Sequence, residues 1–421
     1  MIKQLLVRPP GALARNSFRF LTWQILRAGC LAAYLLLLTR ILGATTYGAL
    51  SGPLSLAAIF GTLSGGGAGL MLLRDTAKDS SDLALAWSRM WSAIMISTPI
   101  CVTLYVVLTK ILFGSTFPLR ILLVLAASEI ILLPVVAVVA LAFQARERLG
   151  TAGAIMTLPA LGRLIAVMLL AVAAPTQPLT TYLALHLGAT AVVAGIAVAL
   201  LMTRTPLTWR VTVLPLGWWR DCLGLSTMYF VTSAAVDLDK SLVLRNGTAE
   251  MAGHYNLGYR LAMILTLPVQ ALAQAALPRA VRQLEDRSRE VIRLVVSLGV
   301  VTFLYSFFAS ITLWLCGATI IGWFGRDFSE VLTMIPAFCV LLTLYNLRLI
   351  PCVILQAAGQ PLRRAGIEAI ALVLLCALSA ILVPRYGLPG ALMTAIASEF
   401  WIFAVALIAA ARTILSHSRI K

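Results

Sequence analysis

Long apolar stretches follow one another along almost the whole chain, separated by short polar connections. Each stretch is close to the roughly 20 residues that an α-helix needs to cross a bilayer. We place them near residues 18–42, 47–73, 83–108, 119–143, 151–174, 179–202, 217–242, 253–279, 292–316, 331–357, 366–383 and 389–411. The pattern predicts an all-α polytopic membrane protein with about 12 transmembrane helices. The connections leave no room for a separate soluble domain.

Composition supports this fold class. Of the 421 residues, 61% are hydrophobic and only 12% are charged, and the mean hydropathy is +0.96. The formal net charge of +17 does not indicate nucleic acid as a partner, because basic residues of polytopic proteins collect in cytoplasmic loops. With a cytoplasmic N-terminus, the inner segments hold 21 Lys and Arg residues and the outer segments hold 6. This bias predicts that both termini are cytoplasmic.

The two halves of the chain show weak internal similarity. The segment QARERLGTAG (144–153) is followed 212 residues later by QAAGQPLRRAG (356–366), and two other matches have offsets near 204 and 209. Repeats of half the chain length are typical of transporters built from two six-helix halves. The longest break between apolar stretches lies at 203–219. The predicted domains are an N-terminal six-helix lobe (1–205), a cytoplasmic linker (206–218) and a C-terminal six-helix lobe (219–421).

Three segments carry a resemblance to a known family. TRILGATTYGAL (39–50) resembles the R-x-LG-x-x-x-YG signature after the first span of polysaccharide exporters. DKSLVLRNGTAEMAGHYNLGYRL (239–261) is similar to their D-[KR]-x-x-[IL]…G-x-Y stretch, and 354–399 resembles their L-x-A-x-G-[RQ]…P-x-[FY]-G segment. The chain thus resembles the O-antigen or exopolysaccharide flippases of the multidrug/oligosaccharidyl-lipid/polysaccharide (MOP) exporter superfamily.

This resemblance implies a fold and a function. The fold would be that of a MATE-like, V-shaped transporter with a central cavity. The function would be translocation of polyprenyl-diphosphate-linked oligosaccharide units from the cytoplasmic to the periplasmic leaflet of the bacterial inner membrane, by alternating access. Membrane lipids, a polysaccharide polymerase and a chain-length regulator are the further partners that it implies. It implies no catalytic residue.

Ionisable residues inside the apolar stretches are the candidate site, because a charge within a membrane is costly unless it faces a cavity or a partner. Six of them are basic and four are acidic, which suits an anionic head group better than a lipophilic cation. Arginine binds phosphate through two parallel hydrogen bonds. The candidate diphosphate-binding residues are Arg27, Arg163, Arg260 and Arg348. The candidate residues for ion coupling or structural ion pairs are Glu129, Asp237, Asp239, Lys240 and Glu399.

Structural roles compete with these assignments. Glu129 and Arg163 flank one inner loop at similar depth and are candidates for a structural pair. Arg27 and Arg260 belong to opposite predicted lobes, and we expect them to face each other across the cleft. The alternative for Arg260 is an ion pair with Asp237 or Asp239 on the neighbouring helix.

Two other functions compete with this one. A cation-coupled multidrug antiporter of the same superfamily is the nearest alternative, and the basic excess argues against it. A membrane-embedded glycosyltransferase or polymerase is less favoured, because the outer connections are short and the chain contains no enzyme motif that we recognise. The seven cysteines and three histidines have no metal-ligand spacing, so we expect neither a metal site nor a cofactor other than a coupling H⁺ or Na⁺.

The loop charges give a test of topology. Reporter fusions at Leu207 and Lys421 should both report a cytoplasmic location, because the basic residues concentrate on that side. A periplasmic signal from either fusion would contradict the arrangement.

Overall fold

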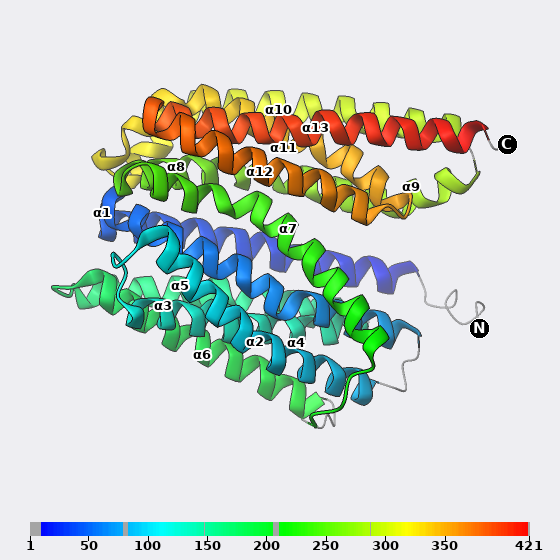
Figure 1. The fold of residues 1–421 in the computed structure, drawn as a ribbon, viewed down its shortest axis with the longest axis horizontal. Helices are drawn as coiled ribbons and strands as arrows, with labels where there is room; N and C mark the ends of the chain where they lie inside the picture. The colour runs from blue at the N-terminus through cyan, green and yellow to red at the C-terminus, as the bar shows by residue number, and fades with distance from the viewer. Residues whose placement is uncertain (1–9, 79–82, 147, 205–209, 287, 420–421) are drawn as a thin grey trace. The chain divides into compact units, whose positions relative to one another are not determined.

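The computed structural model describes residues 10–78, 83–146, 148–204, 210–286 and 288–419, which form helices joined by short turns and contain no strand (Figure 1). The α-helices are α1 (Pro10–Lys78), α2 (Leu83–Phe113), α3 (Leu119–Ala126), α4 (Leu133–Ala145), α5 (Leu149–Ala173), α6 (Pro178–Arg204), α7 (Leu216–Asn246), α8 (Ala249–Ile264), α9 (Leu267–Asp286), α10 (Ser288–Phe324), α11 (Glu330–Ala357), α12 (Pro361–Tyr386) and α13 (Leu388–Arg419). Two short elements are the π-helix η3 (Ala127–Leu132) and the 3₁₀-helix η4 (Arg326–Phe328). The predicted all-α fold is confirmed.

The helices account for the apolar stretches of the sequence. Nine described helical segments are long and apolar enough to cross a membrane, and the longest, Thr22–Thr76, has a kink that divides it into two of the predicted spans. Two predicted spans lie outside these nine. They correspond to α7, which carries six charged residues between Arg220 and Arg245, and to the pair α8–α9. The protein is therefore a multi-pass membrane protein.

The kink in α1 lies at Gly43, whose φ of 70° and ψ of 172° are not helical. This conformation is open to glycine because it has no Cβ. The glycine of the sequence Leu42-Gly43 thus ends one helical half and lets the chain begin the next. The sequence places the break between the first two spans at the same point.

The third predicted span contains a π-helical turn. The α-helical pattern of α3 changes to η3 at Ala127 and returns at Leu133. Pro134, directly after this turn, has no N–H to donate to the preceding turn, and π-turns insert where the regular helix bond is interrupted. Glu129 lies inside the turn and is almost completely buried.

The expected continuous helix over 253–279 is wrong in its interior. The chain forms α8 up to Ile264 and starts α9 at Leu267. Between them the N–H groups of Leu265 and Thr266 donate to carbonyls three residues back, which tightens the end of α8. Pro268 explains the break, because proline cannot continue a helical hydrogen-bond ladder and disfavours a helical residue before it.

The described residues fall into two compact units. Unit 1 comprises those of Met1–Leu42 and Leu56–Phe230, and unit 2 those of Gly43–Ser55 and Val231–Lys421. The change of unit after Phe230 therefore falls inside α7, and a short part of α1 packs with unit 2. The predicted lobes and linker (1–205, 206–218 and 219–421) stay a prediction.

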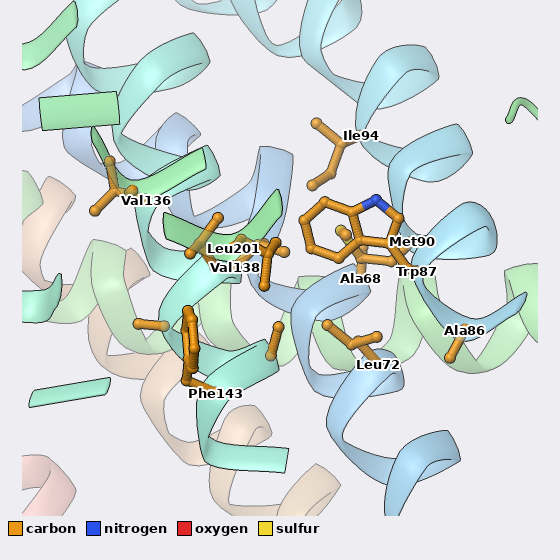
Figure 2. Close-up of a cluster of buried hydrophobic side chains, with 14 of the residues drawn as sticks. Ala68, Leu72, Ala86, Trp87, Met90, Ile94, Val136, Val138, Phe143 and Leu201 are labelled. Atoms are coloured by element: carbon orange, nitrogen blue, oxygen red, sulfur yellow. The ribbon is translucent and has the colours of Figure 1, made fainter. Parts of the chain in front are cut away.

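Each unit has an apolar core. In unit 1, Figure 2 shows the Trp87 indole of α2 beside Met90, Ile94 and Leu72, in a cluster that also takes side chains from α4, α5 and α6. Trp87 is only 1% exposed, so a large apolar surface is removed from lipid and water there. The core of unit 2 is formed by side chains of α9 to α13.

Other apolar side chains point outward in rows. On α2, Ile100, Leu104, Val107 and Ile111 are each about half exposed or more, and their spacing puts them on one helix face. Such a face on a helix of spanning length is suited to contact with lipid.

A close helix contact joins the 43–55 segment to α8. A Cβ on Gly48 would lie 1.7 Å from the Ala249 carbonyl oxygen, and one on Gly253 would lie 2.2 Å from that of Ala44. Asn256 of α8 donates a hydrogen bond of 2.9 Å to the Tyr47 hydroxyl. The two family-like segments of the sequence, 39–50 and 239–261, therefore meet here, and their glycines allow the backbones to touch.

This contact predicts the effect of adding one methyl group. Gly253→Ala should lower the free energy of unfolding of the purified protein by about 1–3 kcal/mol or more. The new Cβ would clash with backbone atoms of Ala44, which cannot move aside as a side chain can. The control is Gly299→Ala in α10, where no atom lies within 4 Å of the added Cβ. It should be neutral or raise stability by about 0.5–1 kcal/mol. Equal melting temperatures for the two variants in detergent would contradict the close packing.

Candidate functional site

Glu129 is the centre of a buried polar cluster in unit 1. Its Oε1 atom lies 2.7 Å from Nη2 of Arg163 on α5 and 3.0 Å from Nε2 of His186 on α6. Glu129 and His186 are each about 2% exposed or less. A carboxylate at this depth is tolerated because it has a cationic partner and a further hydrogen bond. The pair between Glu129 and Arg163 that the sequence suggests is present.

Aromatic residues extend the cluster from α6 to α1. The hydroxyls of Tyr34 and Tyr182 are 2.6 Å apart, and the Tyr182 ring stacks on the His186 ring with centroids 5.7 Å apart. Neither His186 nor Tyr182 is among the site residues predicted from the sequence. The available signal is their spacing of four residues on α6, which places them on one helix face.

Arg27 lies in the same unit and differs from the other predicted residues. It is half-buried on α1, close enough to Arg163 for the two guanidinium charges to repel. Within the described part of the chain, Arg27 has no hydrogen-bonding or ion-pair partner. This part of unit 1 thus holds two arginines, Arg27 and Arg163, and one described carboxylate, Glu129. The cluster therefore has a formal surplus of one positive charge.

Lys240 is the centre of the first cluster in unit 2. Its ammonium group lies 3.0 Å from Oδ1 of Asp239 and 3.2 Å from Oδ1 of Asp237, and it sits 3.6 Å from the centroid of the Tyr259 ring. The Tyr255 hydroxyl donates to the other oxygen of Asp239. Lys240 is 1% exposed, so two carboxylates and an aromatic face replace the water around its charge.

Arg348 and Glu399 form a second buried pair in unit 2. Nε of Arg348 on α11 lies 3.0 Å from Oε2 of Glu399 on α13, and both side chains are less than a tenth exposed. The guanidinium carbon also lies 4.4 Å from the centroid of the Tyr345 ring. Arg348 is therefore neutralised by a residue of its own unit, which favours its structural role in this conformation.

Unit 2 contains a third buried pair, which was not predicted from the sequence. Glu368 on α12 accepts a hydrogen bond of 3.0 Å from Arg364 and one of 2.7 Å from the Thr232 hydroxyl on α7. It is 2% exposed. The spacing of four residues between Arg364 and Glu368 is the signal that would have found it.

Arg260 lies half-buried on α8, where its Nε donates a hydrogen bond of 3.2 Å to the Asn256 side chain. Asp237 and Asp239 both contact Lys240. An ion pair of Arg260 with one of these carboxylates, the structural alternative, stays a prediction. The predicted approach of Arg260 to Arg27 across the cleft stays a prediction.

The two units thus differ in the balance of acidic and basic residues in their buried clusters. In unit 2 the carboxylates of the buried pairs outnumber their cationic partners, with Asp237, Asp239, Glu368 and Glu399 against Lys240, Arg348 and Arg364. In unit 1 the surplus is positive. Ionic groups buried in helices of a membrane protein are typical of transport paths. Within the described residues, no three His, Cys, Asp or Glu side chains form a group that could hold a metal ion.

The fold is that of known transporters. An inward-facing multidrug resistance MATE family transporter of the MOP superfamily superposes with a TM-score of 0.70 at 14% sequence identity, covering 94% of this chain and 95% of that one. A MOP superfamily transporter from Pyrococcus furiosus gives a TM-score of 0.66 at 13% identity, covering 97% and 96% of the two chains. The chain therefore has the fold of MATE-type membrane transporters.

Sequence comparison identifies the family of the chain. Residues 13–284 match the family of polysaccharide biosynthesis proteins, so the chain belongs to that family. The match covers most of the chain, and the resemblance noted in the sequence is confirmed. No curated protein matches the sequence.

The Arg348–Glu399 pair allows structural and transport roles to be separated. Arg348→Met alone leaves Glu399 as an uncompensated buried charge and should destabilise the protein by about 3–5 kcal/mol. The double variant Arg348→Met/Glu399→Leu removes both charges and should restore most of that stability. Asp221→Ala, which breaks the exposed pair with Arg74, should change stability by about 1 kcal/mol or less.

Melting temperature and transport measured on the same preparations decide the role of this pair. Recovery of both stability and transport in the double variant means that the pair is structural. Recovery of stability without transport means that its charges act in the transport cycle. A double variant as unstable as the single one would contradict the pairing itself.

Proposed function

We propose that this transporter is a flippase for polyprenyl-diphosphate-linked oligosaccharide units. It moves them from the cytoplasmic to the periplasmic leaflet by alternating access between its two lobes, for O-antigen or exopolysaccharide assembly. Membership of the polysaccharide biosynthesis family supports a substrate of this class. The MATE-type fold supports a transport mechanism.

The observation that carries the proposal is the positive surplus at Arg27. A half-buried arginine beside a second arginine is unfavourable unless an anion joins them. A diphosphate offers such an anion, because its oxygens accept parallel hydrogen bonds from guanidinium groups. Arg27 and Arg163 are therefore the proposed diphosphate contacts in unit 1. Arg260 is the proposed contact in unit 2, because Arg348 is already held by Glu399.

Coupling to H⁺ or Na⁺ is part of the proposal. Glu129, Asp237, Asp239 and Glu399 are carboxylates held by cationic side chains, with Lys240 shared between two of them. A proton or sodium ion bound at such a carboxylate would weaken its hold on the basic partner. That change would let the partner move during the transport cycle.

The proposed setting follows from the basic loops. We place the protein in the bacterial inner membrane with both termini in the cytoplasm. Membrane lipids surround it, and a polysaccharide polymerase and a chain-length regulator would act on the unit that it delivers.

A cation-coupled multidrug antiporter is the competing function. The carboxylates of unit 2 outnumber their buried basic partners, which is the arrangement that would attract a lipophilic cation. The surplus of positive charge at Arg27 favours the flippase instead. Deleting the gene separates the two functions: a flippase mutant loses surface polymer, whereas an antiporter mutant keeps the polymer and becomes sensitive to cationic drugs.

Substitution of Arg27 tests the proposed diphosphate contact most directly. Arg27→Ala should reduce transport of the lipid-linked oligosaccharide by about tenfold or more, because a charge-assisted hydrogen bond contributes about 1.5–3 kcal/mol. Arg27→Lys should rescue only part of it, since lysine restores the charge without the planar pair of donors. The assay uses purified protein in vesicles, with transport per folded molecule as the readout. An imposed H⁺ or Na⁺ gradient in the same vesicles identifies the coupling ion.

The matched control is Arg120→Ala, which removes an exposed arginine at the start of α3. It should transport like the unaltered protein. Full activity of Arg27→Ala, or an equal loss in Arg120→Ala, would remove Arg27 from the substrate site.

A further inference from the structure

A lateral cavity of about 910 Å³ lies in unit 1, apart from the Glu129 cluster. Its walls come from four helices, and three of its apolar lining residues, Leu26, Leu161 and Ile196, are 41–50% exposed. It is therefore open toward the surroundings of the helices. Its volume lies within the range of about 300–1,000 Å³ that is usual for pockets that bind small molecules.

One end of this cavity is cationic. Arg19 of α1, Arg146 after α4 and Arg148 before α5 line it, and no acidic residue is among the described lining residues. Glu147, between the last two arginines in the sequence, lies outside the described residues. An anion at this end would therefore meet three guanidinium groups.

The start of α5 adds further hydrogen-bond donors at the same end. Arg148 is the N-cap residue, and its side chain makes no capping hydrogen bond. The first helical bond of α5 runs from the Ala152 N–H to the Arg148 carbonyl, so the amides before Ala152 have no partner within the helix. A Cβ on Gly150 would lie 3.6 Å from the Cβ and Cδ atoms of Arg19, which places the Arg19 side chain beside these amides. Helix starts of this kind bind phosphate groups.

The rest of the cavity is mostly apolar. Trp23, Phe143, Ile155, Leu158 and Leu200 line it beyond the arginines. The Thr157 hydroxyl donates a hydrogen bond of 3.0 Å to the Trp23 carbonyl, which fixes α1 against α5 at this wall. A ligand that fills the cavity must therefore combine an anionic head with a hydrocarbon chain.

We propose that this cavity binds an anionic glycerophospholipid of the cytoplasmic leaflet, with its phosphate at the three arginines and an acyl chain along the apolar wall. Basic pockets between helices on the cytoplasmic side recognise such head groups. The predicted topology puts this end of α5 in the cytoplasm. The oligosaccharide substrate fits less well, because the walls beyond the arginines have few groups for sugar hydroxyls.

The bound lipid would join the beginning of α1 to the turn between α4 and α5. Its head group neutralises charges from both segments, and its chain covers the apolar wall between them. This inference does not depend on the flippase proposal, because the lipid stays in the cavity whatever is transported.

The test measures retention of phosphatidylglycerol and of phosphatidylcholine by the purified full-length protein, using native mass spectrometry from mixed micelles. Phosphatidylglycerol should be retained in clear preference. In Arg19→Gln/Arg148→Gln its affinity should fall by about 25-fold, or roughly fivefold for each arginine. The control Arg210→Gln/Arg220→Gln removes the same charge from exposed positions outside the cavity and should retain the lipid.

A second variant keeps the arginines and fills the cavity. Ala154→Phe places a ring in the space for the chain and should reduce retention to the level of the double arginine variant, with an unchanged melting temperature in lipid-free detergent. Equal retention of the two lipids, or retention unaffected in the double arginine variant, would overturn the proposal. Retention of glycerol phosphate as strong as that of phosphatidylglycerol, or a co-purified polyprenyl diphosphate in the cavity, would also overturn it.

Discussion

The cost of burying charge away from water governs the interior of both units. A carboxylate or ammonium group loses several kcal/mol of hydration when it enters a low-dielectric interior, and only a close partner compensates for that loss. Glu129, Lys240, Glu368 and Glu399 each have such a partner, at 2.7–3.0 Å. Two of these pairs, Glu129–Arg163 and Arg348–Glu399, join different helical elements, so the contacts that make these charges tolerable also position the helices.

Arg27 is the exception to this rule, and it is therefore the candidate residue for binding an anionic ligand. It stands half-buried near Arg163 without a described partner of its own. The buried carboxylates considered above each have a basic partner inside their own unit. A position where the protein leaves a positive charge uncompensated is suited to a ligand that brings a negative one. The lipid diphosphate of the proposed function would bring such a charge.

Much of the fold is predictable from the sequence because its determinants are local. Apolar stretches of spanning length give the helices, and the glycine at 43 gives the kink in α1. The π-turn at Glu129 and the break before α9 were not predicted. Each lies just before a proline, Pro134 or Pro268, and the sequence does not show whether a proline kinks, widens or breaks its helix. The Glu129–Arg163 pair follows from similar depth on adjacent spans. His186, 57 residues from Glu129, requires knowledge of which face of α6 turns inward.

The account depends most directly on the charge of the transported head group. The decisive measurement follows the purified protein in vesicles with two fluorescent substrates that carry the same oligosaccharide and polyprenyl chain, one through a diphosphate and the other through an uncharged linker. The account predicts protein-dependent movement of the diphosphate substrate between leaflets and little or none of the uncharged one. Equal rates for the two substrates, or no movement of the diphosphate substrate above that in protein-free vesicles, would contradict it.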